Sequence, residues 1–183
     1  MNGLPGKIVA VHEALNDAGH AHAFGGALAL AWCTEAARGT IDIDVNVFVD
    51  ADEAAAVVEA LPDGVVATAD EVERLRRDGQ IRLWWDTTPV DVFLNTDRFH
   101  EQAAARVRWE DFGGHRLPFL SCTDLAVFKA FFDRTKDWAD LEAMAEVGSL
   151  DLDRVVGVLV RRLGPDDHRI DRLRALDAIE PRD

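Results

Sequence analysis

The stretch His22–Asp50, HAFGGALALAWCTEAARGTIDIDVNVFVD, holds the features that decide the fold. A glycine pair, Gly25-Gly26, opens an alanine- and leucine-rich segment with the composition of a buried helix. A run that alternates apolar and polar side chains follows and predicts a β-strand. Because side chains two residues apart on a strand point to the same face, we expect Asp42 and Asp44 to aim their carboxylates at one point.

A third acid stands in a second strand-like run, TTPVDVFLN, where Asp91 lies between apolar residues. If the two runs are neighbouring strands, Asp91 joins Asp42 and Asp44 on one face. Three convergent carboxylates beside a glycine turn suit Mg²⁺ held together with the phosphates of a nucleotide. Alternating acids also occur on solvated strand faces, so the pair of acids alone does not define a site.

The remaining chain alternates predicted helices and strands up to about residue 120 and is helical beyond it. Strands are predicted over 21–24, 41–49, 80–86 and 90–94, with a hairpin over 107–112 and 115–120. Helices are predicted over 5–18, 27–37, 51–61, 68–77, 97–105, 121–134, 137–147, 151–163 and 166–178. This order predicts an α/β (α+β) fold: a mixed β-sheet core over 1–120 flanked by helices, and a C-terminal helical region over 121–183 packed on it.

Composition limits the classes of protein that the chain can belong to. The 183 residues carry 20 basic and 34 acidic side chains, a net charge of −14, which argues against sequence-independent binding of duplex DNA. No apolar run reaches the roughly 18 residues that span a bilayer, and the polar opening residues are not expected to act as a secretory signal. The two cysteines, Cys33 and Cys122, lie in apolar helical contexts and are expected to be reduced residues of a cytoplasmic protein.

The order GG…RGTIDIDV…PVDVF…DLAVFKAFFDRTKDWADL resembles the nucleotidyltransferase superfamily with the DNA-polymerase-beta-type fold. Within it, the chain looks most like the AbiEii/AbiGii-type toxin nucleotidyltransferases, over about residues 20–145. The resemblance implies that Gly25 and Gly26 lie under the triphosphate of an NTP. It also implies that Asp42, Asp44 and Asp91 bind Mg²⁺ or Mn²⁺, and Asp91 is in addition a candidate base for the acceptor hydroxyl.

The helical part of the resemblance brings further candidates. Lys129 is expected to approach the nucleotide phosphates, while Lys136 and Asp137 line the same cleft or anchor the helix to it. A lysine at this helical spacing can also simply extend from the edge of the core. Arg38, just before Gly39, is a candidate for neutralising a phosphate, although an arginine at a helix C-terminus needs no function.

These residues predict a metal-dependent nucleotidyltransferase that moves a nucleoside monophosphate from an NTP to an acceptor hydroxyl. The resemblance to toxins suggests a tRNA 3′ end or a protein as acceptor, and a place in a toxin–antitoxin pair with a cognate antitoxin. Three alternatives stay open: a small-molecule acceptor such as an aminoglycoside, a non-catalytic module that binds a nucleotide or a partner, and an antitoxin-like partner protein.

Smaller signals add little to this prediction. Trp84 and Trp85 are adjacent on a predicted strand, so one ring is expected in the core and the other is a candidate for stacking on a base. His20 and His22 have no apparent third ligand, so no zinc site is expected. The basic side chains that cluster in two helices are typical of solvated helix faces, with RNA contact as the alternative; they are Arg74, Arg76, Arg77, Arg161 and Arg162.

Overall fold

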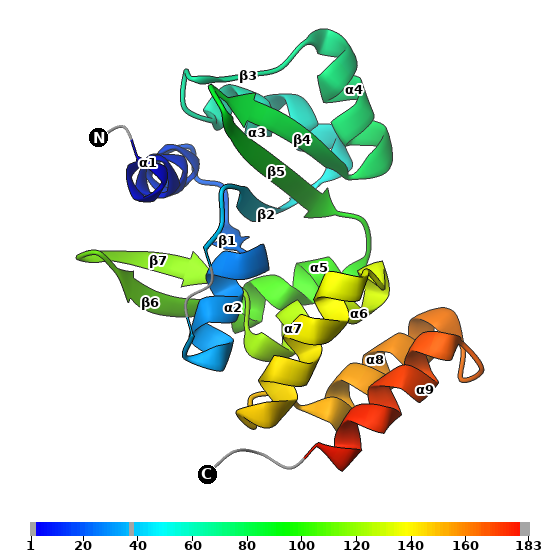
Figure 1. Cartoon of the computed structure of the whole chain (residues 1–183). Coiled ribbons are helices and arrows are strands. Elements are labelled where there is room, and N and C mark those ends of the chain that lie inside the picture. The colour runs from blue at the N-terminus through cyan, green and yellow to red at the C-terminus, as the bar shows by residue number, and fades with distance from the viewer. Residues whose placement is uncertain (1–2, 37–38, 180–183) are drawn as a thin grey trace. The chain divides into compact units, whose positions relative to one another are not determined.

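The computed structural model describes residues 3–36 and 39–179, which form two compact units. The sheet unit comprises residues 3–28 and 39–120, and the helical unit comprises residues 29–36 and 121–179. Figure 1 shows the strands of the first and the helix pairs of the second. The predicted fold class, a mixed β-sheet core flanked by helices and followed by a helical region, is confirmed.

One seven-stranded sheet, in the order β3-β4-β5-β2-β1-β7-β6, forms the sheet unit. Its strands are β1 (His22–Phe24), β2 (Ile43–Asp50), β3 (Val65–Val66), β4 (Gln80–Trp85), β5 (Thr88–Asn95), β6 (Arg108–Phe112) and β7 (His115–Phe119). The pairs β2·β5 and β1·β7 are parallel and the other neighbouring pairs are antiparallel. The alternate apolar residues of β2 and β5 are buried, as their sequence pattern predicts; they are Ile43, Val45, Val47, Val90, Val92 and Leu94.

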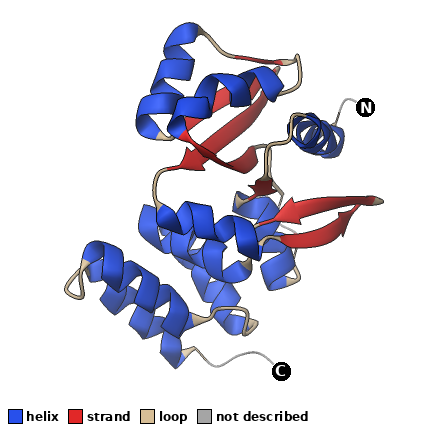
Figure 2. Cartoon of the chain, turned by 180° about the vertical axis from the view of Figure 1, so that it is seen from behind, coloured by secondary structure: helices blue, strands red, loops and turns tan. Residues whose placement is uncertain are grey.

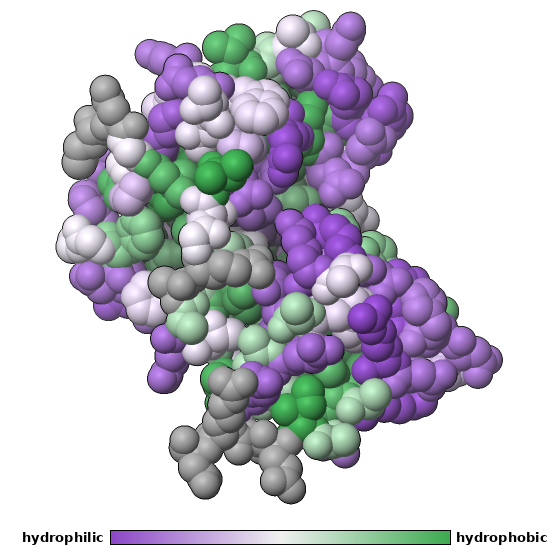
Figure 3. All heavy atoms as spheres, viewed as in Figure 1, coloured by the Kyte–Doolittle hydropathy of each residue, from purple (hydrophilic) through white to green (hydrophobic). Residues whose placement is uncertain are grey.

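Helices cover one face of the β3-β4-β5 part of this sheet. Figures 1 and 2 show α3 (Ala54–Ala60) and α4 (Ala69–Asp78) on one side of β4 and β5, while α5 (Arg98–Ala103) lies toward the end of β5. The helix α4 begins at Thr68, whose side chain and that of Glu71 form a reciprocal capping box. Its outer surface is hydrophilic (Figure 3), because Leu75 is its one buried side chain.

The helix α1 (Leu4–Asp17) is tied to the β4–β5 turn by a lysine. The Lys7 ammonium donates to the Trp85 carbonyl at 2.7 Å and lies 3.1 Å from a carboxylate oxygen of Asp86. Asp86 and Thr87 form a two-residue turn, with Asp86 in the left-handed backbone region at φ 53°. The hairpin therefore turns earlier than the predicted connection over 87–89, and Pro89 lies inside β5.

The helical unit is built from α6 (Cys122–Phe132), α7 (Thr135–Glu146), α8 (Leu152–Leu163) and α9 (His168–Ala175), together with residues 29–34 of α2 (Gly26–Thr34). Its core contains Trp138, whose indole N–H donates to Asp133 at 2.7 Å. Asp133 ends α6 in the left-handed region and also accepts from His168 at 2.7 Å. These hydrogen bonds lower the pKa of Asp133, with that from His168 contributing most.

The prediction of reduced cysteines is wrong, because Cys33 and Cys122 form a disulfide within the helical unit. The fold places the end of α2 beside the start of α6, with the two Cα atoms 5.5 Å apart, which is within bridging range. The two cysteines are 89 positions apart, so no local pattern could reveal the pairing. The expectation of a cytoplasmic protein rested partly on reduced cysteines and loses that support.

Most predicted helices and strands are present in the structure, with small differences at their ends. The helix α2 stops at Thr34, three residues early, because Glu35 adopts a left-handed backbone with φ 53°. The two-residue strand β3 was not predicted, since it is too short to show alternation. No helix in the described ranges has the length and apolar character to cross a bilayer.

Candidate active site

The predicted acids lie on neighbouring strands of the sheet unit. Asp44 of β2 is the direct register partner of Asp91 on the parallel strand β5. Asp42 lies one residue before β2, and its carboxylate accepts a hydrogen bond from the Thr40 hydroxyl. Asp44 and Asp91 share the sheet face opposite α3 and α4, here called the acid face, which is seen in front of those helices in Figure 1.

The glycine pair packs against this group of acids. The Gly25 N–H donates to the Asp44 carbonyl at 2.9 Å, which ties the turn to β2. Gly26 begins α2 with φ 52°, a left-handed conformation that favours glycine. A Cβ atom at Gly26 would overlap the Asp44 carboxylate, so a side chain cannot be accommodated there unless Asp44 moves. The sequence requires glycine here for both reasons, and the first turn of α2 faces an acid, which its dipole favours.

An arginine that the sequence analysis did not single out pairs with these acids. Arg82 on β4 is the register partner of Asp91 and binds both of its carboxylate oxygens, at 2.7 and 2.6 Å. The same guanidinium lies 3.9 Å from the Asp42 carboxylate. The hydrogen bond to Asp91, followed by the charges of Asp91, Asp42 and Asp44, raises the pKa of Arg82. The Arg82 side chain is nonetheless half exposed to solvent.

The chemistry of the donor set suits a hard divalent cation, because three carboxylates offer oxygen ligands from two adjacent strands. In the conformation described, the cation on Asp91 is the Arg82 guanidinium. Over residues 3–36 and 39–179, no three acidic, histidine or cysteine side chains are spaced as a metal site. A metal that takes the place of this guanidinium requires Arg82 to release the Asp91 carboxylate, which a half-exposed side chain can do.

The candidates in the C-terminal part lie within the helical unit. Lys129 is buried, with its ammonium 2.7 Å from a carboxylate oxygen of Asp140 and 3.6 Å from one of Asp137. Asp137 also accepts from Arg134 at 2.6 Å. The structure thus brings Lys129 and Asp137 together, while Lys136 is exposed. Their contact with a nucleotide stays a prediction, and the candidate at position 38 lies outside the described residues.

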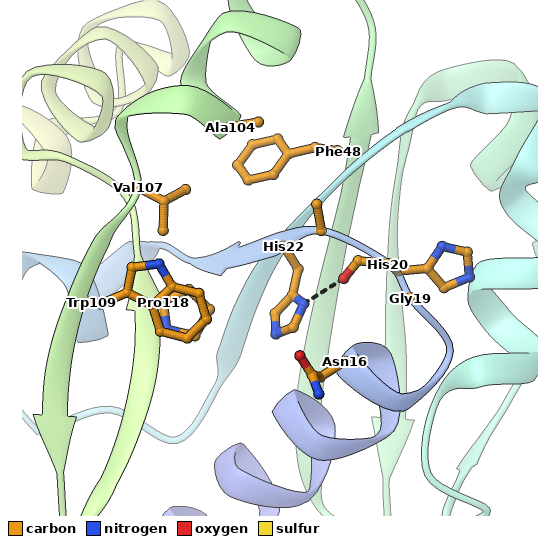
Figure 4. Close-up of a pocket in the computed structure, with 10 residues that line it drawn as sticks. Asn16, Gly19, His20, His22, Phe48, Ala104, Val107, Trp109 and Pro118 are labelled. Carbon is orange, nitrogen blue, oxygen red and sulfur yellow. Dashed lines mark hydrogen bonds between the residues drawn. The ribbon is translucent and has the colours of Figure 1, made fainter.

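A cavity of about 290 Å³ opens elsewhere in the sheet unit (Figure 4). His22 is one of the residues that line it, and the Nδ1 of its ring donates to the His20 carbonyl at 2.8 Å. The other ring nitrogen, Nε2, is 2.9 Å from Nδ1 of His12. Burial lowers the pKa of His22 to about 4, so its Nε2 carries no proton at neutral pH and accepts from His12.

Arg82 could have been found from the hairpin register. A two-residue turn at 86–87 fixes the pairing of β4 with β5 and sets Arg82 opposite Asp91. The sequence pattern predicts the connection at 87–89 instead, which does not set these two residues opposite each other. The partners of Lys129 lie 8 and 11 positions further along the chain on another helix, and only the helix packing reveals that contact.

Comparison with known proteins identifies the fold. No known protein family matches the chain at the sequence level, and no curated protein matches it. Its structure is similar to that of the antibiotic-resistance factor ANT(2'')-Ia, with a TM-score of 0.51 and 13% identity, covering 93% of this chain and 89% of that one. It also matches a nucleotidyltransferase-like protein of Paracoccidioides brasiliensis, with a TM-score of 0.49 and 16% identity, covering 96% and 94%. The similarity to ANT(2'')-Ia shows that the chain shares the fold of that protein.

Proposed function

We propose that this protein is a metal-dependent nucleotidyltransferase. The observation that carries the proposal is the pairing of Asp44 with Asp91 on adjacent parallel strands, directly behind the glycine turn that opens α2. In this reaction the acceptor oxygen bonds to the α-phosphorus of an NTP, the bond to pyrophosphate breaks, and the acceptor proton passes to a base. When bound, Mg²⁺ or Mn²⁺ neutralises charge that develops on the phosphates.

In this proposal the residues of the acid face share the tasks of the reaction. Asp44 and Asp91 hold the metal, with Asp42 completing the set, and Asp91 is the candidate base. Arg82 exchanges the Asp91 carboxylate for a phosphate group of the NTP, two oxygens of which its planar guanidinium can bind in the same bidentate manner. The N–H groups at the Gly26 end of α2 approach the triphosphate without obstruction from a side chain.

The test is transfer from each of the four α-labelled NTPs, with Mg²⁺ or Mn²⁺. The acceptors offered are total tRNA, a protein extract and an aminoglycoside, which cover the tRNA, protein and small-molecule possibilities. We expect the label to appear in one acceptor class. Asp44→Asn and Asp91→Asn should each lower the rate of transfer by roughly 100-fold or more, because the metal stabilises the transition state by several kcal/mol.

A matched control is available on the same strand. Asp50, the last residue of β2, is exposed and lies away from the acids in register, so Asp50→Asn should transfer at the native rate. Native rates in Asp44→Asn would overturn the proposal. Metal-dependent NTP binding without product on any acceptor would indicate a non-catalytic module of the same fold.

A further inference from the structure

The acid face continues beyond the acids toward the outer edge of the sheet. On β4, Arg82 and Trp84 are two residues apart and therefore point to the same side. Trp84 pairs with Pro89 on β5 and with Val66 on β3. The residues that alternate with them, such as Leu83 and Val65, point to the other face and are buried.

This outer part of the acid face is apolar and open. The exposed fraction is 52% for Trp84 and 72% for Val66, both high for large apolar residues on a sheet. The neighbour of Trp84 in the sequence, Trp85, lies on the covered face beside Gly64, where a Cβ atom would overlap its ring. The fold therefore partly covers one indole of the pair and leaves the other exposed on the acid face.

The geometry points to a nucleobase as the ligand of this surface. We infer that Trp84 is the platform on which a base stacks, while the phosphates of the same nucleotide reach Arg82 and the acids. Diagonal neighbours on antiparallel strands lie about 7–8 Å apart, which places Trp84 within reach of a ligand bound at Asp91. An exposed indole ring beside a guanidinium offers a base a flat apolar surface and a phosphate a cation.

This inference rests on the proposed function and specifies its nucleotide subsite. The base can come from the NTP or from the 3′ end of an RNA acceptor, and stacking does not distinguish the two chemically. Stacking tolerates every base, because each base has a π-face. The Trp84 surface therefore predicts similar affinity for the four NTPs.

The experiment measures binding of NTPs, inorganic tripolyphosphate and a single-stranded RNA ending in a 3′ hydroxyl, each with Mg²⁺. Trp84→Ala should weaken NTP binding at least about fivefold, the lower end for base–aromatic stacking, and Trp84→Phe should restore most of it. Tripolyphosphate, which has no base, should bind Trp84→Ala and the native protein equally. Trp109, another half-exposed tryptophan in the same sheet, supplies the control Trp109→Ala.

The outcomes separate this inference from the proposed function. Weaker RNA binding with unchanged NTP binding in Trp84→Ala assigns the platform to the acceptor base. Unchanged binding of both ligands in Trp84→Ala overturns the inference and leaves the nucleotidyltransferase proposal standing. Failure of the native protein to bind either NTP or tripolyphosphate overturns both. Equal losses in Trp84→Ala and Trp109→Ala mean a general structural effect and also overturn the inference.

Discussion

The two charge clusters of this protein differ in how far water reaches them. In the sheet unit, the Arg82 side chain is 52% exposed and its partner Asp91 is 14% exposed. In the helical unit, the Lys129 side chain is 7% exposed and Asp140 is 5% exposed. Both clusters join one cation to two acids, since Arg82 also approaches Asp42 and Lys129 also approaches Asp137.

Exposure decides what each cluster can do. Separating a buried ion pair leaves an uncompensated charge in a poorly polarisable interior. Moving Lys129 away from its acidic partners therefore costs much free energy. A half-exposed guanidinium can return to water at little cost, and Arg82 can therefore exchange Asp91 for another anion. The comparison teaches that the cluster in the helical unit suits a structural role and the one on the acid face suits a change of partners.

The largest expected effect follows from breaking the buried cluster. Lys129→Met removes the buried ammonium that lies beside Asp140 and Asp137 and should lower the free energy of unfolding by about 3–5 kcal/mol. Chemical denaturation monitored by circular dichroism measures the loss. The double variant Lys129→Met/Asp140→Leu removes both charges and should recover part of it. Equal stability of Lys129→Met and the native protein would show that this pair does not hold the helical unit together.

A buried titratable group in the sheet unit gives the next effect. His22 lies between His12 and the His20 carbonyl, with Glu13 and His115 near His12. Burial lowers the pKa of His22 from 6.5 to about 4, so between these values the unfolded state binds the proton that the folded state excludes. The contribution of neutral His22 to the free energy of unfolding is therefore fully present above about pH 6.5. It is lost as the pH falls toward 4, and the loss is about 3 kcal/mol at most.

Stability curves between pH 4 and 7 measure this contribution. His22→Gln, which does not titrate, should show a shallower loss of stability across that interval than the native protein. An identical slope in the two proteins would assign the acid sensitivity to other groups. Burial therefore acts differently on the two groups. In the helical unit Lys129 is buried together with acidic partners, while in the sheet unit His22 is buried as a neutral side chain.

Sequence patterns predicted what depends on neighbours along the chain. Alternation predicted β2 and β5, and the predicted helix over 68–77 corresponds to α4. Contacts between distant elements were not predictable from the patterns, because they depend on register and packing. The Cys33–Cys122 disulfide and the partners of Lys129 belong to this second kind.

A smaller effect is expected where the glycine turn meets the acids. Gly26→Ala should destabilise the protein by about 1–2 kcal/mol for the left-handed backbone alone, and displacement of the Asp44 carboxylate adds to this. Gly113, at φ 61° in an open turn, provides the control, because Gly113→Ala meets the same backbone strain and no neighbouring atom. Thermal unfolding of both variants isolates the contact with Asp44. Equal losses would mean that Asp44 adapts freely to the extra atom.

The smallest effect on stability is expected for Arg82→Met, and it tests the other side of the comparison. An exposed ion pair contributes about 0–1 kcal/mol, so the variant should unfold close to the native protein. The substitution should instead change ligand binding, because a metal no longer has to displace the Arg82 guanidinium from the Asp91 carboxylate. We expect a lower Mg²⁺ concentration for half-maximal binding and weaker retention of tripolyphosphate, both measured by calorimetry. Arg82→Lys keeps the positive charge but cannot bind two oxygens at once. Its binding of Mg²⁺ and tripolyphosphate should therefore lie between that of the native protein and that of Arg82→Met. A loss of several kcal/mol in Arg82→Met would make the Arg82 pair a structural element like the Lys129 cluster and remove the distinction between them.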